Sequence, residues 1–194
     1  MLGSPASFAW GPKVHRLVNG WAIQTLPEEM RGFFDANRQE LIDHANDPEV
    51  WMLKDRYERM RHYIFLDRYG RFPYSKLPHN YKVALQQIGS SRMTRNGTLP
   101  WQIGEFSLRL TNDFKQQKWG QARIDAAALG FYVADAHDPL QTTENFDGQL
   151  TNEAGLATRF GNVLADRYSH FFMFRSEDAE KVADPTEYAF QIVL

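Results

Sequence analysis

The sequence predicts an all-α fold, with several helices in a single domain that spans residues 1–194. Apolar side chains recur every three to four residues in stretches such as 14–26 and 103–117, which is the spacing of one helix face. No stretch shows the alternation of apolar and polar residues that is typical of a half-buried strand. With 194 residues, of which 43% are apolar and 24% charged, the chain is long enough to bury a sizeable core.

Prolines and acidic residues mark the expected helix boundaries in the first half of the chain. Pro12 suits the first turn of a helix that continues to about Leu26. Acidic residues at 28 and 29 suit the start of a second helical stretch, which breaks near Asn37 and ends at 44–48. Three further segments are expected before residue 80: a solvated charged helix or loop at 49–61, a short buried segment at 62–66, and a loop at 70–78.

The second half of the chain contains the longest expected helices. Apolar periodicity and turn residues predict helices at 81–93, 103–117, 119–136, from 153 onward, at 168–174 and at 187–194, with a turn at 96–101. Pro139 ends the central helix, because a proline ring clashes with the preceding turn and has no N–H to donate. A polar, turn-prone run at 142–148 follows it.

Composition excludes several classes of function. A net charge of −2 gives no overall attraction to nucleic acid or to an anionic membrane surface. No apolar run reaches the ~20 residues that a membrane span needs. The chain has no cysteine, which excludes disulfides and thiolate metal sites, so a zinc ion would have to be bound by histidine and carboxylate.

The residues before Trp10 resemble a signal-peptidase site. Ser7 and Ala9 are small residues at the −3 and −1 positions of such a site. Only nine residues precede Trp10, and they contain neither a positively charged start nor an apolar core. Either the signal is truncated in this sequence or the pattern is a coincidence.

Three residues stand out as candidates for chemistry, and each has a structural alternative. Asp135 is the only carboxylate in an apolar helical turn, where burial is costly unless it pairs with a cation or a metal. A hydrogen bond to the following loop explains it equally well. Asp47 precedes Pro48 and suits a turn or helix cap. His15 suits the surface or the core of the first helix.

Four motifs carry a resemblance to a known family. They are D-A-H-D-P-L at 135–140, T-T-E-N-F-D-G-Q-L-T at 142–151, W-G-P-K-V-H at 10–15 and G-T-L-P-W at 97–101. Together they resemble the bacterial zinc-dependent phospholipases C and, more distantly, the fungal single-strand-specific nucleases of the same superfamily. The resemblance implies a nearly all-α fold, three zinc ions in a cleft, hydrolysis of phosphate esters, and a secreted or periplasmic location.

The resemblance also implies roles for individual residues. Trp10 and His15 would bind one zinc ion, although the Trp10 amine is free only if the chain is cleaved after Ala9. Asp47 and His62, fifteen residues apart as in the family, and Asp135 would be further metal ligands, with Asp47 and Asp135 as the catalytic carboxylates. His137 would hydrogen-bond a ligand rather than contact the ion.

The sequence departs from the family pattern at several ligand positions. Phe131, Gln141, Ala157 and Gly161 stand where the family has metal ligands, and Phe65 stands where the bacterial relatives usually have a second acidic residue. Ligands at i and i+4 share one helix face. Because Ala157 and Gly161 replace such a pair, ligands of the same ion are missing together. The family domain also continues beyond Leu194, so its C-terminal part is expected to be absent.

Two functional hypotheses follow. The first is a zinc-dependent phosphodiesterase with one or two ions at most and with weak or lost activity; manganese or another divalent ion is an alternative to zinc. The second is a non-catalytic helical scaffold that binds one metal ion, a phosphorylated ligand or a partner protein. The sequence does not decide between phospholipid and nucleic acid as substrate, since aromatic residues (14%) stack on bases, face lipid or fill a core. It does not indicate an oligomeric state.

Overall fold

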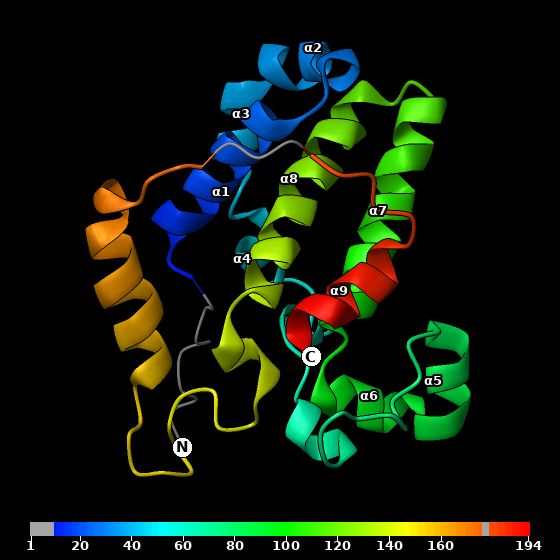
Figure 1. The fold of residues 1–194 in the computed structure, drawn as a ribbon, viewed down its shortest axis with the longest axis vertical. Coiled ribbons are helices and arrows are strands. Elements are labelled where there is room, and N and C mark those ends of the chain that lie inside the picture. The colour runs from blue at the N-terminus through cyan, green and yellow to red at the C-terminus, as the bar shows by residue number, and fades with distance from the viewer. Residues whose placement is uncertain (1–9, 176–178) are drawn as a thin grey trace.

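The helix α8 (Trp119–Ala136) lies at the centre of the protein in a computed structural model that describes residues 10–175 and 179–194 (Figure 1). Its buried residues cover most of its circumference, which is typical of a helix enclosed by others. Five of them are alanines, so neighbouring helices can approach closely. α7 (Leu99–Lys115) packs on one side of α8, and α1 (Pro12–Thr25) packs on the other.

The remaining helices surround these three. α3 (Arg38–Asp43) contacts α1 and α8, α2 (Glu28–Ala36) adjoins α1 and α3, and α9 (Pro185–Val193) packs against α7 and α8. The shorter segments are α4 (Asp47–Trp51), η1 (Glu58–His62), η2 (Leu66–Tyr69), α5 (Tyr81–Ile88), α6 (Ser90–Asn96), η3 (Pro139–Thr142), η4 (Thr158–Asp166) and η5 (Ser169–Phe171). The described residues contain no strand, so the all-α prediction is confirmed.

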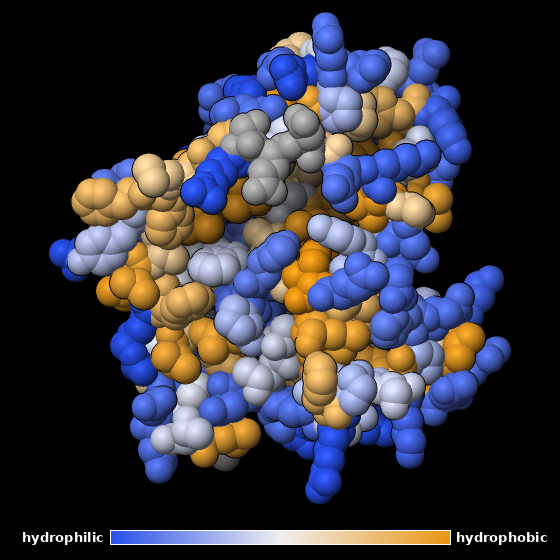
Figure 2. All heavy atoms as spheres, in the orientation of Figure 1, coloured by the Kyte–Doolittle hydropathy of each residue, from blue (hydrophilic) through white to orange (hydrophobic). Residues whose placement is uncertain are grey.

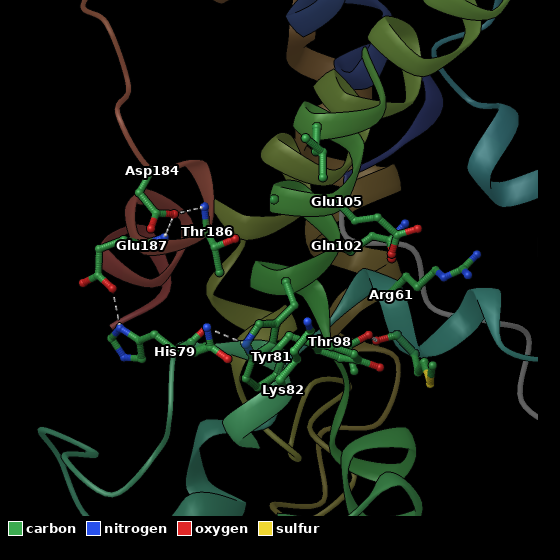
Figure 3. A pocket seen from close by; sticks show the side chains of 15 residues that line it. Arg61, His79, Tyr81, Lys82, Thr98, Gln102, Glu105, Asp184, Thr186 and Glu187 are labelled. Atoms are coloured by element: carbon green, nitrogen blue, oxygen red, sulfur yellow. Dashed lines mark hydrogen bonds and ion pairs between the residues drawn. The ribbon is translucent and has the colours of Figure 1, made fainter. Parts of the chain in front are cut away.

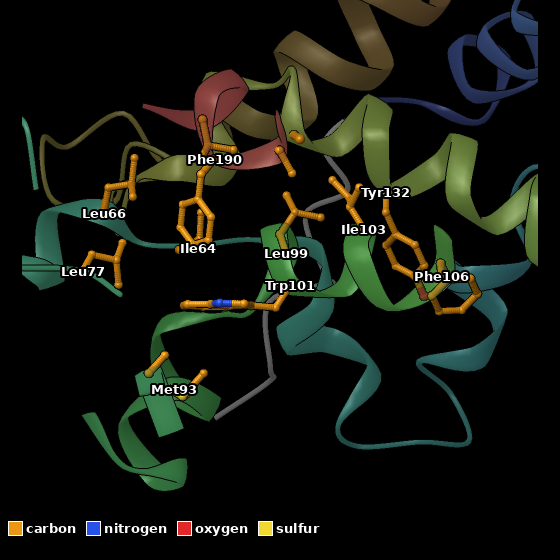
Figure 4. Close-up of a cluster of buried hydrophobic side chains, with 14 of the residues drawn as sticks. Ile64, Leu66, Leu77, Met93, Leu99, Trp101, Ile103, Phe106, Tyr132 and Phe190 are labelled. Atoms are coloured by element: carbon orange, nitrogen blue, oxygen red, sulfur yellow. The ribbon is translucent and has the colours of Figure 1, made fainter. Parts of the chain in front are cut away.

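Two clusters of buried side chains form the core. The larger joins α7, α8 and α9 to the segment after η1, through residues such as Phe106, Tyr132, Phe190 and Ile64 (Figure 4). The smaller lies between α1, α2, α3 and α8. Because α8 contributes to both, its side chains hold the two halves of the core together.

Some helix boundaries differ from the prediction. The expected helix at 81–93 is two helices, because Gly89 adopts φ +86 and ends α5. The expected turn at 96–101 is shorter: Gly97 has φ +87 and lies against the Tyr63 carbonyl, and α7 already begins at Leu99. The aromatic stretch at 168–174 forms only the single turn η5. The prediction of a signal-peptidase site falls on residues 7–9, which lie outside the described residues.

The surface shown in Figure 2 is mixed rather than uniformly polar. Apolar side chains gather on this face over η4 and around α9, and hydrophilic ones cover much of the rest. Val163, Leu164 and Phe171 are among the large apolar residues that remain exposed. Within the part of the chain that the structure describes, no helix has both the length and the apolar character needed to cross a bilayer.

Substitution of Phe190 tests the packing of α9. The Phe190 ring is fully buried and stacks on the His79 ring, with centroids 3.9 Å apart, and meets Trp101 edge-on at 5.1 Å. We expect Phe190→Ala to lower the free energy of unfolding by about 3–5 kcal/mol, because it leaves a cavity in the main core. The matched control on the same helix is Tyr188→Ala, whose side chain is exposed and whose loss should cost about 0.5 kcal/mol or less. Urea denaturation followed by circular dichroism measures both, and equal losses would contradict the assigned packing.

Candidate functional site

Three of the predicted side chains, from three separate segments, meet beside the central helix. Asp135 of α8 lies between His62, at the end of η1, and His15 of α1. One carboxylate oxygen, Oδ2, is 2.8 Å from His62 Nδ1, and the other, Oδ1, is 3.7 Å from His15 Nε2. All three residues are buried. Residues that are far apart in the sequence therefore form one buried His–Asp–His cluster.

A second carboxylate, Glu58, holds the other side of the His62 ring. Glu58 Oε1, one turn earlier in η1, is 3.5 Å from His62 Nε2, which is close enough for an ion pair although no full hydrogen bond forms. Glu58 is itself buried and accepts hydrogen bonds from the Tyr132 hydroxyl and from Arg61 Nη1, the latter at 2.6 Å. With one carboxylate at each ring nitrogen, the surroundings favour an imidazolium, in which both nitrogens are donors.

The pKa values agree with an ion-pair network. Burial alone would lower the pKa of His62, but the hydrogen bonds and charges of Asp135 and Glu58 outweigh it and raise this pKa to about 9. Burial raises the pKa of Asp135 to about 6 against the opposing effect of His62. The pKa of Glu58 is lowered, because bonds from His62, Tyr132 and Arg61 outweigh burial. At neutral pH His62 is therefore charged and lies between two ionised carboxylates.

His15 is the neutral member of the cluster. Burial, aided by the charge of His62, lowers the pKa of His15 to about 3. Both of its ring nitrogens are buried and make no full hydrogen bond with a described residue, although the Trp10 backbone is close enough to raise the pKa of His15 slightly against these effects. Its ring stacks on Phe131, with centroids 3.7 Å apart and planes 8° from parallel. The backbone of Trp10 also interacts with His15, and the Trp10 indole donates to the Ala134 carbonyl at 2.7 Å.

Two further acids surround the cluster. Glu49 has a buried, unpartnered Oε1, and burial together with the charge of Asp135 raises its pKa to about 7. Asp138 is fully buried; its Oδ1 accepts from the Leu140 N–H at 2.8 Å, whereas Oδ2 lacks a partner in the described residues. Burial raises the pKa of Asp138 to about 6. The region therefore contains more carboxyl groups than positively charged side chains.

The sequence prediction missed Glu49, Glu58 and Asp138. The stretch 49–61 was expected to be solvated, but Glu58 is buried, because its turn packs against α8 and α7. A signal was present for Glu58, which precedes His62 by four residues and so lies one turn away on a helix. Asp138 directly precedes Pro139, a local pattern that indicates only a turn.

The remaining predicted site residues, and the positions where the family has ligands, make other contacts or carry no ligand atom. Asp47 begins α4 and pairs with His44, whose Nδ1 is 2.6 Å from Asp47 Oδ2; no ion pair or hydrogen bond joins it to the buried cluster. His137 is exposed at the end of α8, and its side chain makes no hydrogen bond to a described residue. Gln141 and Ala157 are buried, and the Gln141 carbonyl accepts from the Ile64 N–H at 2.9 Å. Gly161 is also buried.

Two donor atoms of the cluster are available to a divalent ion. His15 Nε2 and Asp135 Oδ1 are unpartnered, buried and 3.7 Å apart, and imidazole with carboxylate suits zinc. Each nitrogen of His62, by contrast, lies within 3.5 Å of a carboxylate oxygen. Over residues 10–175 and 179–194, no three or more His, Asp or Glu side chains are arranged as a metal site. Additional ligands would have to come from backbone or water.

An open pocket of about 770 Å³ adjoins this network on the side of Arg61 (Figure 3). Glu187 of α9 and His79, whose Nδ1 is 2.7 Å from the Glu187 carboxylate, line one wall. Arg61 and Glu105 line the other. Since Arg61 is bonded to Glu58, the pocket is one residue away from the carboxylate that contacts His62.

Comparison with known proteins does not assign a family to this chain. No family model, no curated protein and no solved structure matches it. The likeness to the phospholipases C and nucleases therefore depends on sequence motifs alone.

The charged state of His62 predicts how stability depends on pH. In the unfolded chain its pKa is near 6.5, and in the fold it is about 9, so the folded state holds this proton more tightly. The resulting stabilisation is fully present below about pH 6.5 and is lost as the pH rises through about 9. We expect the free energy of unfolding of the metal-free protein to fall by on the order of 2–3 kcal/mol over that interval.

Denaturant titrations at a series of pH values measure this dependence. His62→Gln should be less stable at neutral pH and should show little change over the same interval. Glu49→Gln is the control, because its raised pKa of about 7 acts mainly between about pH 4.5 and 7. A free energy of unfolding of the wild-type protein that stays constant from about pH 6.5 to about 9.5 would contradict the imidazolium assignment.

Proposed function

We propose that this chain is a helical protein of the zinc-dependent phospholipase C and nuclease kind that binds one divalent ion and hydrolyses phosphodiesters weakly or not at all. The observation that carries the proposal is the buried pair of His15 Nε2 and Asp135 Oδ1, which lie 3.7 Å apart and make no hydrogen bond with described residues. Unpartnered buried polar groups cost free energy. One ion bound to both groups would remove that cost.

Several features of the cluster support weak rather than strong hydrolysis. Multi-metal phosphodiesterases use separate ions to activate water and to stabilise the leaving oxygen. Here His62 is held by two carboxylates, and Phe131 places an apolar ring on His15. The loss of an ion costs several kcal/mol of transition-state stabilisation, and ~1.4 kcal/mol is already tenfold in rate.

The substrate and the location are part of the same proposal. By resemblance the substrate is a phosphate ester, either of a phospholipid or of a nucleic acid, and the protein is secreted or periplasmic. Zinc is the first choice of ion, because the donors are imidazole and carboxylate.

The ion-pair network favours a second candidate, a non-catalytic scaffold. The His62 imidazolium supplies a positive charge between Asp135 and Glu58 without any metal. A cluster that is neutralised in this way can serve stability alone, and the protein would then act by binding a phosphorylated ligand or a partner protein.

Metal content and hydrolysis separate the two candidates. The purified protein is loaded with zinc, dialysed, and subjected to elemental analysis beside a bis-p-nitrophenyl phosphate assay. We expect one ion per chain and little turnover, with the ion lost in His15→Ala and Asp135→Asn but kept in His170→Ala, which changes an exposed histidine. Three bound ions with rapid turnover would contradict the proposal, and no bound ion would favour the scaffold.

Restoring one ligand provides a gain-of-function test. Phe131 lies four residues before Asp135 on α8 and stacks on His15, so Phe131→His adds an imidazole beside both proposed ligands. We expect zinc affinity to rise about tenfold or more and hydrolysis to become measurable, whereas Phe131→Leu should change neither.

The full restoration adds Gln141→His, Ala157→His and Gly161→Glu. Ala157 is fully buried, so a larger side chain there overpacks the site at a cost of about 1–3 kcal/mol. The single change at Phe131 is therefore measured first. If the Phe131→His protein binds zinc no better than the Phe131→Leu control, the proposed ion position between His15 and Asp135 is wrong.

A further inference from the structure

A second, smaller pocket lies outside the buried cluster and contains three arginines. Its volume is about 430 Å³, and its lining residues are Phe65, Arg68, Arg92, Arg95, Asn96 and Glu144. Arg92, Arg95 and Asn96 lie on α6 at spacings of three and four residues, so they share one face of that helix. The pocket shares no lining residue with the His15–His62–Asp135 cluster.

The charges of this arginine pocket are unbalanced. Arg68 pairs with Glu144, which is the only acidic residue in the lining. Arg92 donates from Nη2 to the Arg68 carbonyl at 2.7 Å, and Arg95 donates from Nη1 to the Ser91 hydroxyl at 3.2 Å. Neither guanidinium makes an ion pair with a carboxylate of the described residues. Two positive charges thus face one pocket, and a bound anion would offset their repulsion.

The floor of the arginine pocket offers a hydrogen-bond donor that lacks an acceptor. Asn96 is 6% exposed, and its amide nitrogen Nδ2 makes no full hydrogen bond in the described part of the chain; its side chain lies near the Tyr69 hydroxyl, which is likewise unsatisfied. The backbone carbonyl of Asn96 accepts from the Phe65 N–H at 2.7 Å, which fixes the residue against the pocket wall. A buried donor without an acceptor costs free energy, and an oxyanion between Asn96 and the arginines would accept from all of them.

An aromatic wall completes the arginine pocket. The Phe65 ring stacks on Tyr63, with centroids 4.3 Å apart, and lies parallel to Phe146 at 6.0 Å. The lining therefore combines guanidinium donors with the face or edge of a ring. Arginine is the residue that best matches the geometry of phosphate oxygens, and an aromatic ring suits the planar group of an ester.

We propose that this pocket binds the dianionic phosphate group of a small, soluble aryl or heteroaryl monoester, with Arg92, Arg95 and Asn96 as donors to the phosphate and Phe65 against the ring. The site does not depend on a metal ion or on the phosphodiesterase proposal. Binding is therefore expected to persist in EDTA and in the Asp135→Asn variant.

Isothermal titration calorimetry of the full chain in EDTA tests the proposal. The probes are inorganic phosphate, phenyl phosphate, and vesicles that contain phosphatidic acid. We expect phenyl phosphate to bind more tightly than inorganic phosphate and the vesicles to bind no better than neutral ones. Arg92→Gln and Arg95→Gln should each weaken the binding of phenyl phosphate about tenfold or more. Arg56 is an exposed arginine outside the pocket, so Arg56→Gln should leave the affinity unchanged.

A substitution that changes the charge of a side chain but keeps its shape gives a second test. Asn96→Asp keeps the size of the side chain but places a carboxylate at the floor of the arginine pocket, so it should abolish binding while circular dichroism shows an intact fold. The proposal is overturned if phenyl phosphate does not bind, if binding is indifferent to the arginine and Asn96 variants, or if only the vesicles bind.

Discussion

The contact between Asp135 and His62 is the interaction on which the surrounding structure depends. It joins residues 73 positions apart at 2.8 Å and attaches the end of η1 to the central helix α8. The chain just after His62 makes backbone hydrogen bonds to two other segments: the Ile64 N–H donates to the Gln141 carbonyl, and the Phe65 N–H donates to the Asn96 carbonyl. A buried ion pair of this kind adds little net stability by itself, but removal of one partner leaves an uncompensated charge. The pair therefore determines where η1 lies against α8 as much as it stabilises the fold.

Each oxygen of Asp135 faces a different imidazole, and this division bears directly on function. Oδ2 bonds the charged His62, whereas Oδ1 faces the neutral His15. A proton on His62 and an ion at His15 would thus share one carboxylate without competing for the same atom. In the wider region, the half-buried Glu49 holds its proton up to about pH 7, which limits the negative charge around Asp135. The cluster can consequently be neutralised by protons alone, by an ion, or by both.

Much of the fold could be predicted from the sequence, and the site only in part. The helices α1, α7, α8 and α9 follow from apolar periodicity, with Pro12 marking the start of α1 and Pro139 the end of α8; the start of α7 did not, because Pro100 was assigned to a turn. Gly89 was not recognised as a break, because an isolated glycine inside a periodic stretch does not show whether it adopts positive φ.

The convergence of His15, His62 and Asp135 was expected from the family resemblance, since no local pattern relates segments so far apart. Glu58 was missed because a charged stretch does not reveal which of its side chains turns inward. Asp47, expected in the same site, pairs instead with His44, the nearest histidine on the preceding turn.

The segment from His62 to Leu66 explains how two chemically different regions lie so close together. It was expected to be buried throughout, but only His62, Ile64 and Leu66 are buried, whereas Tyr63 and Phe65 are half-exposed. Tyr63 has an extended backbone, in which successive side chains point to opposite sides. One side therefore delivers His62 to Asp135 and Ile64 to the core, and the other delivers Phe65 to the arginine pocket. Buried side chains and the backbone hydrogen bonds of Ile64 and Phe65 hold the segment in this conformation, so its exposed side chains are available for a separate binding function.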